Sequence, residues 1–381
     1  MTVSAYGGSL REKAEALEGL MAERHLFAGE VLPHVVLPPV GRADHQTGNF
    51  EDACISTGEY LGAESFRWAA TGQAEARERA RQSADALIRM QTITGTPGFF
   101  ARGFKQADGP TWDERAFFFW QEWHQAGEYR WLGDTSADSF NGRTFGLCLY
   151  YDLAVDGPER VRVREDMARV VGTFIDNRLR LVDVDGRMTL WGNFNPWILE
   201  ENLNALQALN HLKCAWHVTG EMRFQEEYLR LIREHDYARR AVEAKVLPHG
   251  STPPWDDNLG MQALYHLLCY EDDPDLLAYY HASLDRYWEA LAGEGNPFFN
   301  LVYKVYEAGG RGQGPVADFR KGEEMNPAVV DWFRAYEPPR RQAAFDIPGR
   351  GRVQAVTEDS PHVFLRNYWM ARYFGFLTEE A

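Results

Sequence analysis

Carboxylates at two loop-to-helix junctions are the side chains of this sequence best placed for acid and base chemistry. In WLGDTSADSFNG, Asp134 occupies an N-cap position, and Asp138 follows four residues later on the same helix face. In PPWDDNLG, Asp256 and Asp257 lie ahead of another helix, which begins near Asn258. Adjacent carboxylates cannot both cap one helix, so each junction is expected to offer a carboxyl group that is not needed for capping.

Two carboxyl groups that face each other across a cleft can hydrolyse a glycosidic bond, one as acid and the other as base or nucleophile. A separation of about 5 Å leads to retention at the anomeric carbon, and one of about 6.5–9.5 Å leads to inversion. The sequence therefore predicts a pair made of Asp138 or Asp134 with Asp256 or Asp257.

Aromatic, amide and charged side chains in the same loops could hold a sugar, whose ring faces pack on Trp and whose hydroxyls bind polar groups. Packing anchors, or a salt bridge in the case of Arg102, are the alternative roles for such residues. The predicted substrate-binding residues are Glu59, Tyr60, Arg102, Trp131, Trp191, Asn193, Trp197, Asn204, His249 and Trp255.

Two histidines offer a different chemistry. His362 in DSPHVF and His249 in LPHGS could abstract a proton beside a carboxylate or carbinol, with Tyr60 and Arg102 as partners. That arrangement would make a lyase, an epimerase or a dehydratase. A histidine that only satisfies hydrogen bonds at a loop end is the alternative.

Signatures of other chemistry are missing from the sequence. It has no GxSxG, GxxxxGK[ST] or HExxH motif, no EF-hand loop and no dinucleotide fingerprint after a strand. We therefore expect neither a metal nor a cofactor in the site.

The elements that must position these residues are helix hairpins. Four times, an apolar helix almost free of Lys and Arg ends at a short turn, and a charge-rich amphipathic helix follows. The turns contain Gly72, Gly157 with Pro158, Gly220, and Asp273 with Pro274, as expected where one helix ends and the next begins.

Two weaker pairs bring the total to about twelve helices. One is PFFNLVYKVYEAG with VADFRKGEEMNPAVVDWFRAYE, and the other pairs HVFLRNYWMARYFGFL with the N-terminal LREKAEALEGLMAERHLF as its outer partner. The sequence thus predicts one all-α domain over residues 1–381, an (α/α)₆ toroid (six-hairpin barrel), with one short β-hairpin at Asp185-Gly186 in a loop. An open α-solenoid is the alternative, but the irregular repeat and long Trp- and Asp-rich links favour a closed ring.

In such a ring, every loop from an outer helix to the next inner helix emerges at the same end. The long loops that carry the candidate residues are all of this kind, whereas the turns at the other end are short. One cleft at the long-loop end is therefore the expected site.

Charge excludes some partners. The net charge of −16, from 40 Lys and Arg against 56 Asp and Glu, repels nucleic acid and anionic membranes. The sequence has no apolar run near the roughly 20 residues needed to cross a bilayer. A cytoplasmic protein with a small-molecule or oligosaccharide substrate is expected, unless a signal peptide has been removed. Oligomeric state is left open.

This pattern resembles the six-hairpin glycosidase superfamily, which includes unsaturated glucuronyl and rhamnogalacturonyl hydrolases, sugar 2-epimerases and the toroid domains of polysaccharide lyases. The stretch RWLGDTSADSF is similar to the Trp-Asp-Thr segment that opens an inner helix in the unsaturated glucuronyl hydrolases. The resemblance implies that Asp134 transfers the proton. Those enzymes usually continue with a Met-rich apolar helix, where this chain has Ser136, Asp138, Asn141 and Arg143.

The leading hypothesis is a glycoside hydrolase with acid and base carboxylates in a central cleft. A lyase, epimerase or dehydratase using His362 is the second hypothesis. A non-catalytic helical interaction module is the third, and it would present a flat or convex surface instead of a deep pocket.

Overall fold

The computed structural model describes residues 8–38, 48–107, 122–199, 201–307, 327–347 and 351–378. The described chain is mostly helical with small sheets, as the sequence predicts. None of its helices is long and apolar enough to cross a membrane.

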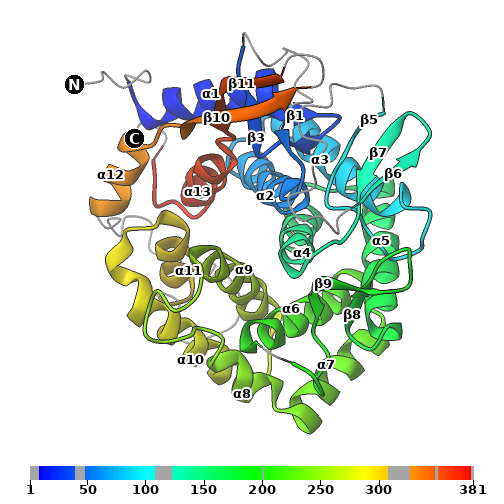
Figure 1. Cartoon of the computed structure of the whole chain (residues 1–381). Coiled ribbons are helices and arrows are strands. Elements are labelled where there is room, and N and C mark those ends of the chain that lie inside the picture. Colours follow the sequence, from blue (N-terminus) through cyan, green and yellow to red (C-terminus); the bar gives the residue numbers. More distant parts are fainter. Residues whose placement is uncertain are drawn as a thin grey trace.

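Six helices contact one another in a closed order. In that order, α2 contacts α4, α4 contacts α6, α6 contacts α9, α9 contacts α11, α11 contacts α13, and α13 contacts α2. Figure 1 shows these helices around a common centre. Their bounds are α2 (Ala53–Thr71), α4 (Ala137–Leu153), α6 (Asn202–Thr219), α9 (Pro254–Tyr270), α11 (Pro297–Glu307) and α13 (His362–Tyr373).

The remaining helices lie outside this central set (Figure 1). They are α1 (Leu10–Leu20), α3 (Ala74–Thr92), α5 (Gly157–Asp176), α7 (Met222–His235), α8 (Tyr237–Val242), α10 (Pro274–Leu291) and α12 (Pro327–Ala335). The N-terminal helix α1 contacts α13, the last helix in the chain. Central and outer helices therefore alternate along the sequence, except that two outer helices, α7 and α8, lie between α6 and α9.

Three of the four predicted turns end or begin helices as expected. Gly72 and Gly220 adopt the left-handed conformation after α2 and α6, and the Asp273 side chain caps α10. At the fourth turn, α4 ends at Leu153 and Asp156 precedes α5, so Gly157 is the first residue of a helix and does not end one.

Glycines let α2 and α4 approach closely. A Cβ atom on Gly58 would lie 1.9 Å from the carbonyl oxygen of Gly142, and one on Gly146 would lie 2.3 Å from that of Gly58. Both distances are far below van der Waals contact, so a side chain at either position would force the two helices apart. The contacts also advance along both helices in the same direction, which brings their first turns to one end.

The sequence predicts the β-hairpin at Asp185-Gly186 correctly, as β8 (Arg180–Val182) and β9 (Met188–Asn193). Three further antiparallel sheets were not predicted. The largest sheet has the strand order β10 (Arg340–Ile347), β11 (Gly351–Asp359), β3 (His34–Val36) and β4 (Gly48–Asn49). The second has the order β5 (Phe104–Gln106), β7 (Tyr129–Leu132) and β6 (Trp123–Ala126). The third pairs β1 (Leu26–Phe27) with β2 (Glu30–Val31).

A buried ionic cluster links α1 to α2, α3 and α13 through Glu18. Its carboxylate accepts hydrogen bonds from the Tyr60 hydroxyl (3.2 Å) and the Trp369 indole (2.8 Å), and it lies 3.5 and 3.6 Å from Arg67 and Arg79. Removing this carboxylate would leave two guanidinium groups with fewer partners in a largely dry region.

We predict that Glu18→Ala lowers the free energy of unfolding by about 3–5 kcal/mol, because it breaks a buried ionic network. Glu15→Ala is the matched control, since Glu15 pairs with Arg11 on the surface of the same helix and such pairs contribute about 0–1 kcal/mol. Urea denaturation followed by circular dichroism measures both. Equal shifts in the two variants would contradict the prediction.

Candidate active site

Acidic side chains meet at the ends where the central helices begin. Asp52 directly precedes α2, Asp138 is the second residue of α4, Glu201 directly precedes α6, and Asp256 is the third residue of α9. Neither Asp52 nor Glu201 caps its helix with its side chain. Because α2, α4, α6 and α9 contact one another in succession, and α4 also contacts α9, these carboxyl groups share one region.

Burial and mutual repulsion raise the pKa values of two of these groups. Burial raises the pKa of Asp138 to about 6, with Asp52 and Glu201 adding to the shift and Arg102 opposing it. Burial also raises the pKa of Asp256 to about 7, with Glu201, Asp138 and Asp257 adding to it and Lys245 opposing. The charge of Asp138 therefore acts on Asp256 directly, as expected of a carboxyl pair in one site.

Beside this pair, Glu59 of α2 organises a network of hydrogen bonds. Its Oε1 atom accepts from Asn258 Nδ2 (2.7 Å), Gln262 Nε2 (2.5 Å) and an Arg366 guanidinium nitrogen (2.7 Å). Burial acts to raise the pKa of Glu59, but Arg366 and His362 outweigh it and hold that pKa at about 2. Glu59 is therefore an ionised anchor and not a proton donor.

His362, the first residue of α13, lies between two partners. Its Nε2 atom is 3.1 Å from Glu59 Oε2, and its Nδ1 atom hydrogen-bonds to the Ser360 hydroxyl. Both ring nitrogens are thus engaged. The imidazole is held in a fixed orientation, with no nitrogen left over to take a proton from a substrate.

Asp257 and Asp256 have different roles although they are neighbours. Asp257 is buried, and both of its oxygens accept from Lys245 Nζ, at 2.6 and 2.8 Å. This ion pair fixes the start of α9. Asp256, which is half-buried, makes no ion pair with the described side chains, so it is the member of the predicted DD motif that remains available for chemistry.

Asp134 does not cap α4. Ser136 is the cap, and its hydroxyl accepts from the Ser139 amide at 3.2 Å. The Asp134 carboxylate instead accepts from the Leu190 amide (2.9 Å) and so ties β9 to the segment before α4. This hydrogen bond to the Leu190 amide argues against the proton-transfer role that the resemblance implies for Asp134.

Several predicted substrate-binding residues have structural tasks. Tyr60 is buried against Glu18, and Trp131 is buried and stacked on His124 with a centroid distance of 4.2 Å. The Arg102 guanidinium is buried and donates to the carbonyl oxygens of Asp134 and Glu51, so it does not project as a carboxylate clamp.

The remaining loop candidates divide into two groups. His249 pairs with Glu294 (2.7 Å), and Asn193 and Asn204 donate to main-chain oxygens. The indoles of Trp191, Trp197 and Trp255, by contrast, are exposed, as expected of rings that stack on a ligand.

Five polar residues of the network around Glu59 were not predicted from the sequence, namely Asn141, Asn258, Gln262, Ser360 and Arg366. Asn141 Nδ2 donates to Gln262 Oε1 at 2.8 Å, and so joins α4 to α9. A signal for three of them was present in the sequence, because Asn141, Gln262 and Arg366 are polar residues inside helices that are otherwise apolar. A buried polar group needs a partner, so such positions indicate a network.

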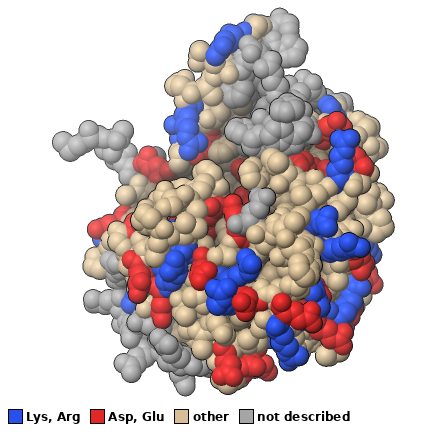
Figure 2. Space-filling model, turned by 60° about the horizontal axis from the view of Figure 1, so that its bottom comes forward, with Lys and Arg blue, Asp and Glu red and all other residues tan. Residues whose placement is uncertain are grey.

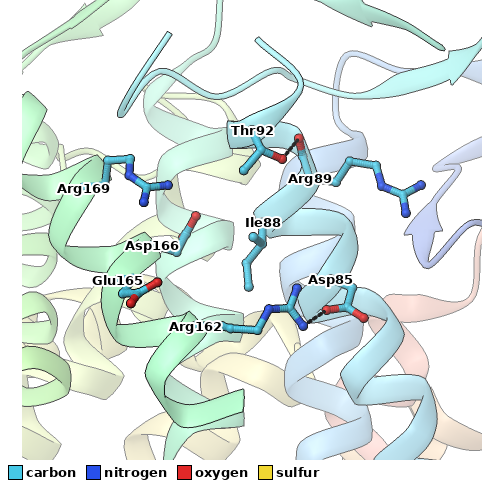
Figure 3. A pocket seen from close by; sticks show the side chains of 8 residues that line it. All are labelled: Asp85, Ile88, Arg89, Thr92, Arg162, Glu165, Asp166 and Arg169. Carbon is cyan, nitrogen blue, oxygen red and sulfur yellow. Dashed lines mark hydrogen bonds and ion pairs between the residues drawn. The ribbon is translucent and has the colours of Figure 1, made fainter. Parts of the chain in front are cut away.

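A separate pocket lies between outer helices α3 and α5 (Figure 3). Its arginines are already engaged: Arg162 pairs with Asp85 (2.7 Å), Arg169 donates to Gln91, and Arg89 donates to the Tyr129 hydroxyl. The lining residues are Asp85, Ile88, Arg89, Thr92, Arg162, Glu165, Asp166 and Arg169. None of the carboxylates of the candidate site is among them.

On the molecular face shown in Figure 2, Lys and Arg side chains alternate with Asp and Glu side chains, without a basic patch among the described residues.

Within the described ranges, no group of three or more His, Cys, Asp or Glu is arranged to hold a metal ion. Comparison with models of known protein families gave no match, and neither did comparison with curated proteins.

The two neighbouring aspartates should respond oppositely to substitution. Asp257→Ala should lower the free energy of unfolding by about 3–5 kcal/mol, because it leaves buried Lys245 unpaired. Asp256→Asn should stabilise the protein at pH 8, because the folded-state pKa of about 7 exceeds the unfolded value of 3.8.

The sign of the Asp256 effect sets its pH dependence. A raised folded-state pKa means that protonated Asp256 favours folding fully below pH 4, and that this contribution is lost as the pH rises through about 7. Thermal denaturation of both variants at pH 4 and pH 8 measures this. A destabilised Asp256→Asn protein at pH 8 would contradict the assignment.

Proposed function

We propose that the chain is an (α/α)₆ toroid of the six-hairpin glycosidase type and acts as a glycoside hydrolase. The architectural part is supported by the closed order of contacts among the six central helices and by the outer helices that alternate with them in sequence. The site would then lie at the end where the central helices begin, which is the end reached by the long loops.

One observation carries the functional part: two carboxyl groups of this site have pKa values raised to about 6 and about 7, and the charge of Asp138 adds to the rise in the pKa of Asp256. At neutral pH the group with the higher pKa holds a proton more of the time, and the other is mostly ionised. Asp256 is therefore the general acid, and Asp138 is the base or nucleophile.

The reaction follows from these roles. Asp256 donates its proton to the glycosidic oxygen as the bond from that oxygen to the anomeric carbon breaks. Asp138 either takes a proton from the water that attacks the anomeric carbon, or attacks that carbon itself before water releases the sugar. In both cases one water is consumed, and the leaving group departs as an alcohol.

The network around Glu59 would position the sugar. Arg366 and Asn258 lie beside Glu59, and Asn258 is only two residues after the proposed acid. Arg366 is buried, so its part would be to fix the orientation of Asn258, which is half-buried and closer to the proposed sugar position.

A lyase or epimerase that uses His362 is less well supported. Both nitrogens of His362 have partners, while Tyr60 and Arg102 are buried in other interactions. An interaction module without catalysis would give no reason for two desolvated, mutually repelling carboxyl groups, because such groups cost stability unless they are used.

We predict that Asp138→Asn and Asp256→Asn each lower kcat about 10²–10⁴-fold on a substrate found by screening aryl glycosides and oligosaccharides for reducing-sugar release. Asp275→Asn is the control, since Asp275 is an exposed residue near the start of outer helix α10. The wild-type rate should peak between about pH 6 and about pH 7. Full activity in both active-site variants would remove this mechanism.

A further inference from the structure

Three tryptophans are unusually exposed, and two of them, Trp197 and Trp255, lie just ahead of a carboxylate of the candidate site in the sequence. The exposed fractions are 51% for Trp191, 81% for Trp197 and 62% for Trp255. Trp191 lies on β9, Trp197 in the segment that leads to Glu201, and Trp255 immediately before Asp256. Large aromatic rings left in water are costly, so a group of them beside a site indicates a surface that a ligand covers.

The loop that carries Trp197 is held rigid. Asn195 accepts from the Trp197 amide (3.0 Å) and donates to the Arg178 carbonyl (2.8 Å), and Asn193 donates to the Ile198 carbonyl (2.8 Å). The Trp197 ring meets His235 edge-on, with centroids 5.2 Å apart. The loop therefore presents this indole at a fixed place, with little conformational entropy left to lose when a ligand binds.

Charge around the site argues against an acidic sugar. Asp52, Asp138, Glu201 and Asp256 make no ion pair with the described side chains. The nearby described cations already have partners inside the protein: Arg102 donates to carbonyl oxygens, Lys245 binds Asp257 and Arg366 binds Glu59. A sugar carboxylate would thus enter a region of negative charge and find no arginine fork available among these residues.

From these observations we infer that the substrate is an uncharged oligosaccharide. One sugar unit lies between Asp138 and Asp256, and further units stack on Trp197 and Trp255. The inference rests on the proposed glycosidase function and adds the substrate class and the extended contact surface to it. The proposed substrate is uncharged, and in this it differs from the uronate substrates of the glucuronyl hydrolases that the sequence resembles.

Calorimetry with the Asp256→Asn protein tests the inference without turnover. The probes are cello-, malto- and N-acetylchito-oligosaccharides of one to six units, with oligogalacturonates of the same lengths. We expect one neutral series to bind about tenfold more tightly at four units than at one, and the oligogalacturonates to bind at least tenfold more weakly.

Trp197→Ala and Trp255→Ala, each made in the Asp256→Asn protein, should remove that gain with chain length and leave binding of the single sugar unchanged. Tyr279→Ala is the matched control, since Tyr279 is an exposed aromatic residue of outer helix α10. It should have no effect on any series.

Three results would overturn the inference: tighter binding of oligogalacturonates, affinity that is independent of chain length, or Trp variants that behave like Tyr279→Ala. A wild-type enzyme that hydrolyses aryl monoglycosides while none of the oligosaccharides binds would also overturn it and leave the glycosidase proposal standing. Absence of hydrolysis of every glycoside tested would instead remove the glycosidase itself.

Discussion

The close approach of α2 and α4 is the constraint on which the candidate site depends. Gly58, Gly142 and Gly146 leave no room for a side chain between the two helix backbones. The contact brings the start of α2, with Asp52 and Glu59, against the start of α4, with Asp138. Without it, the charge of Asp52 would not reach Asp138, and the Glu59 network would not stand beside the carboxyl pair.

Bringing several carboxylates together in the site lowers the stability of the folded protein, and cationic side chains around the site offset part of this loss. Lys245 neutralises Asp257, and Arg366 neutralises Glu59, which also contacts His362. Asp138 and Asp256 are left without such partners, and burial raises the pKa of each. The protein therefore pairs Glu59 and Asp257, whereas the two carboxyl groups that are proposed to react make no ion pair with the described side chains, like Asp52 and Glu201 beside them.

The helices could be read from the sequence because each hairpin repeats the same local signals: an apolar helix, a short turn, then a charged amphipathic helix. Gly72, Gly220 and Asp273 mark helix ends that depend on local geometry alone. The hairpin of β10 and β11 was missed although its pairing is local, whereas the pairing of β11 with β3 joins segments more than 300 residues apart, which local patterns do not reveal.

Among the site residues, the sequence indicated Asp138 and Asp256 through their positions at helix starts. It could not separate Asp256 from Asp257, because only the folded chain brings Lys245 against one of them. It also assigned Tyr60, Trp131 and Arg102 to a ligand, whereas tertiary contacts bury all three. Whether a loop residue faces a cleft or the protein interior depends on contacts that are distant in sequence.

Asp138 and Asp256 are proposed to titrate near neutral pH, with the charge of Asp138 adding to the rise in the pKa of Asp256. Carbon-13 NMR titration of the aspartate side-chain carboxyl groups, assigned with the Asp138→Asn and Asp256→Asn variants, tests this proposal most directly. We predict one transition near pH 6 and one near pH 7, with Asp138→Asn lowering the pKa of Asp256. Independent titration of both groups near pH 4 would contradict it.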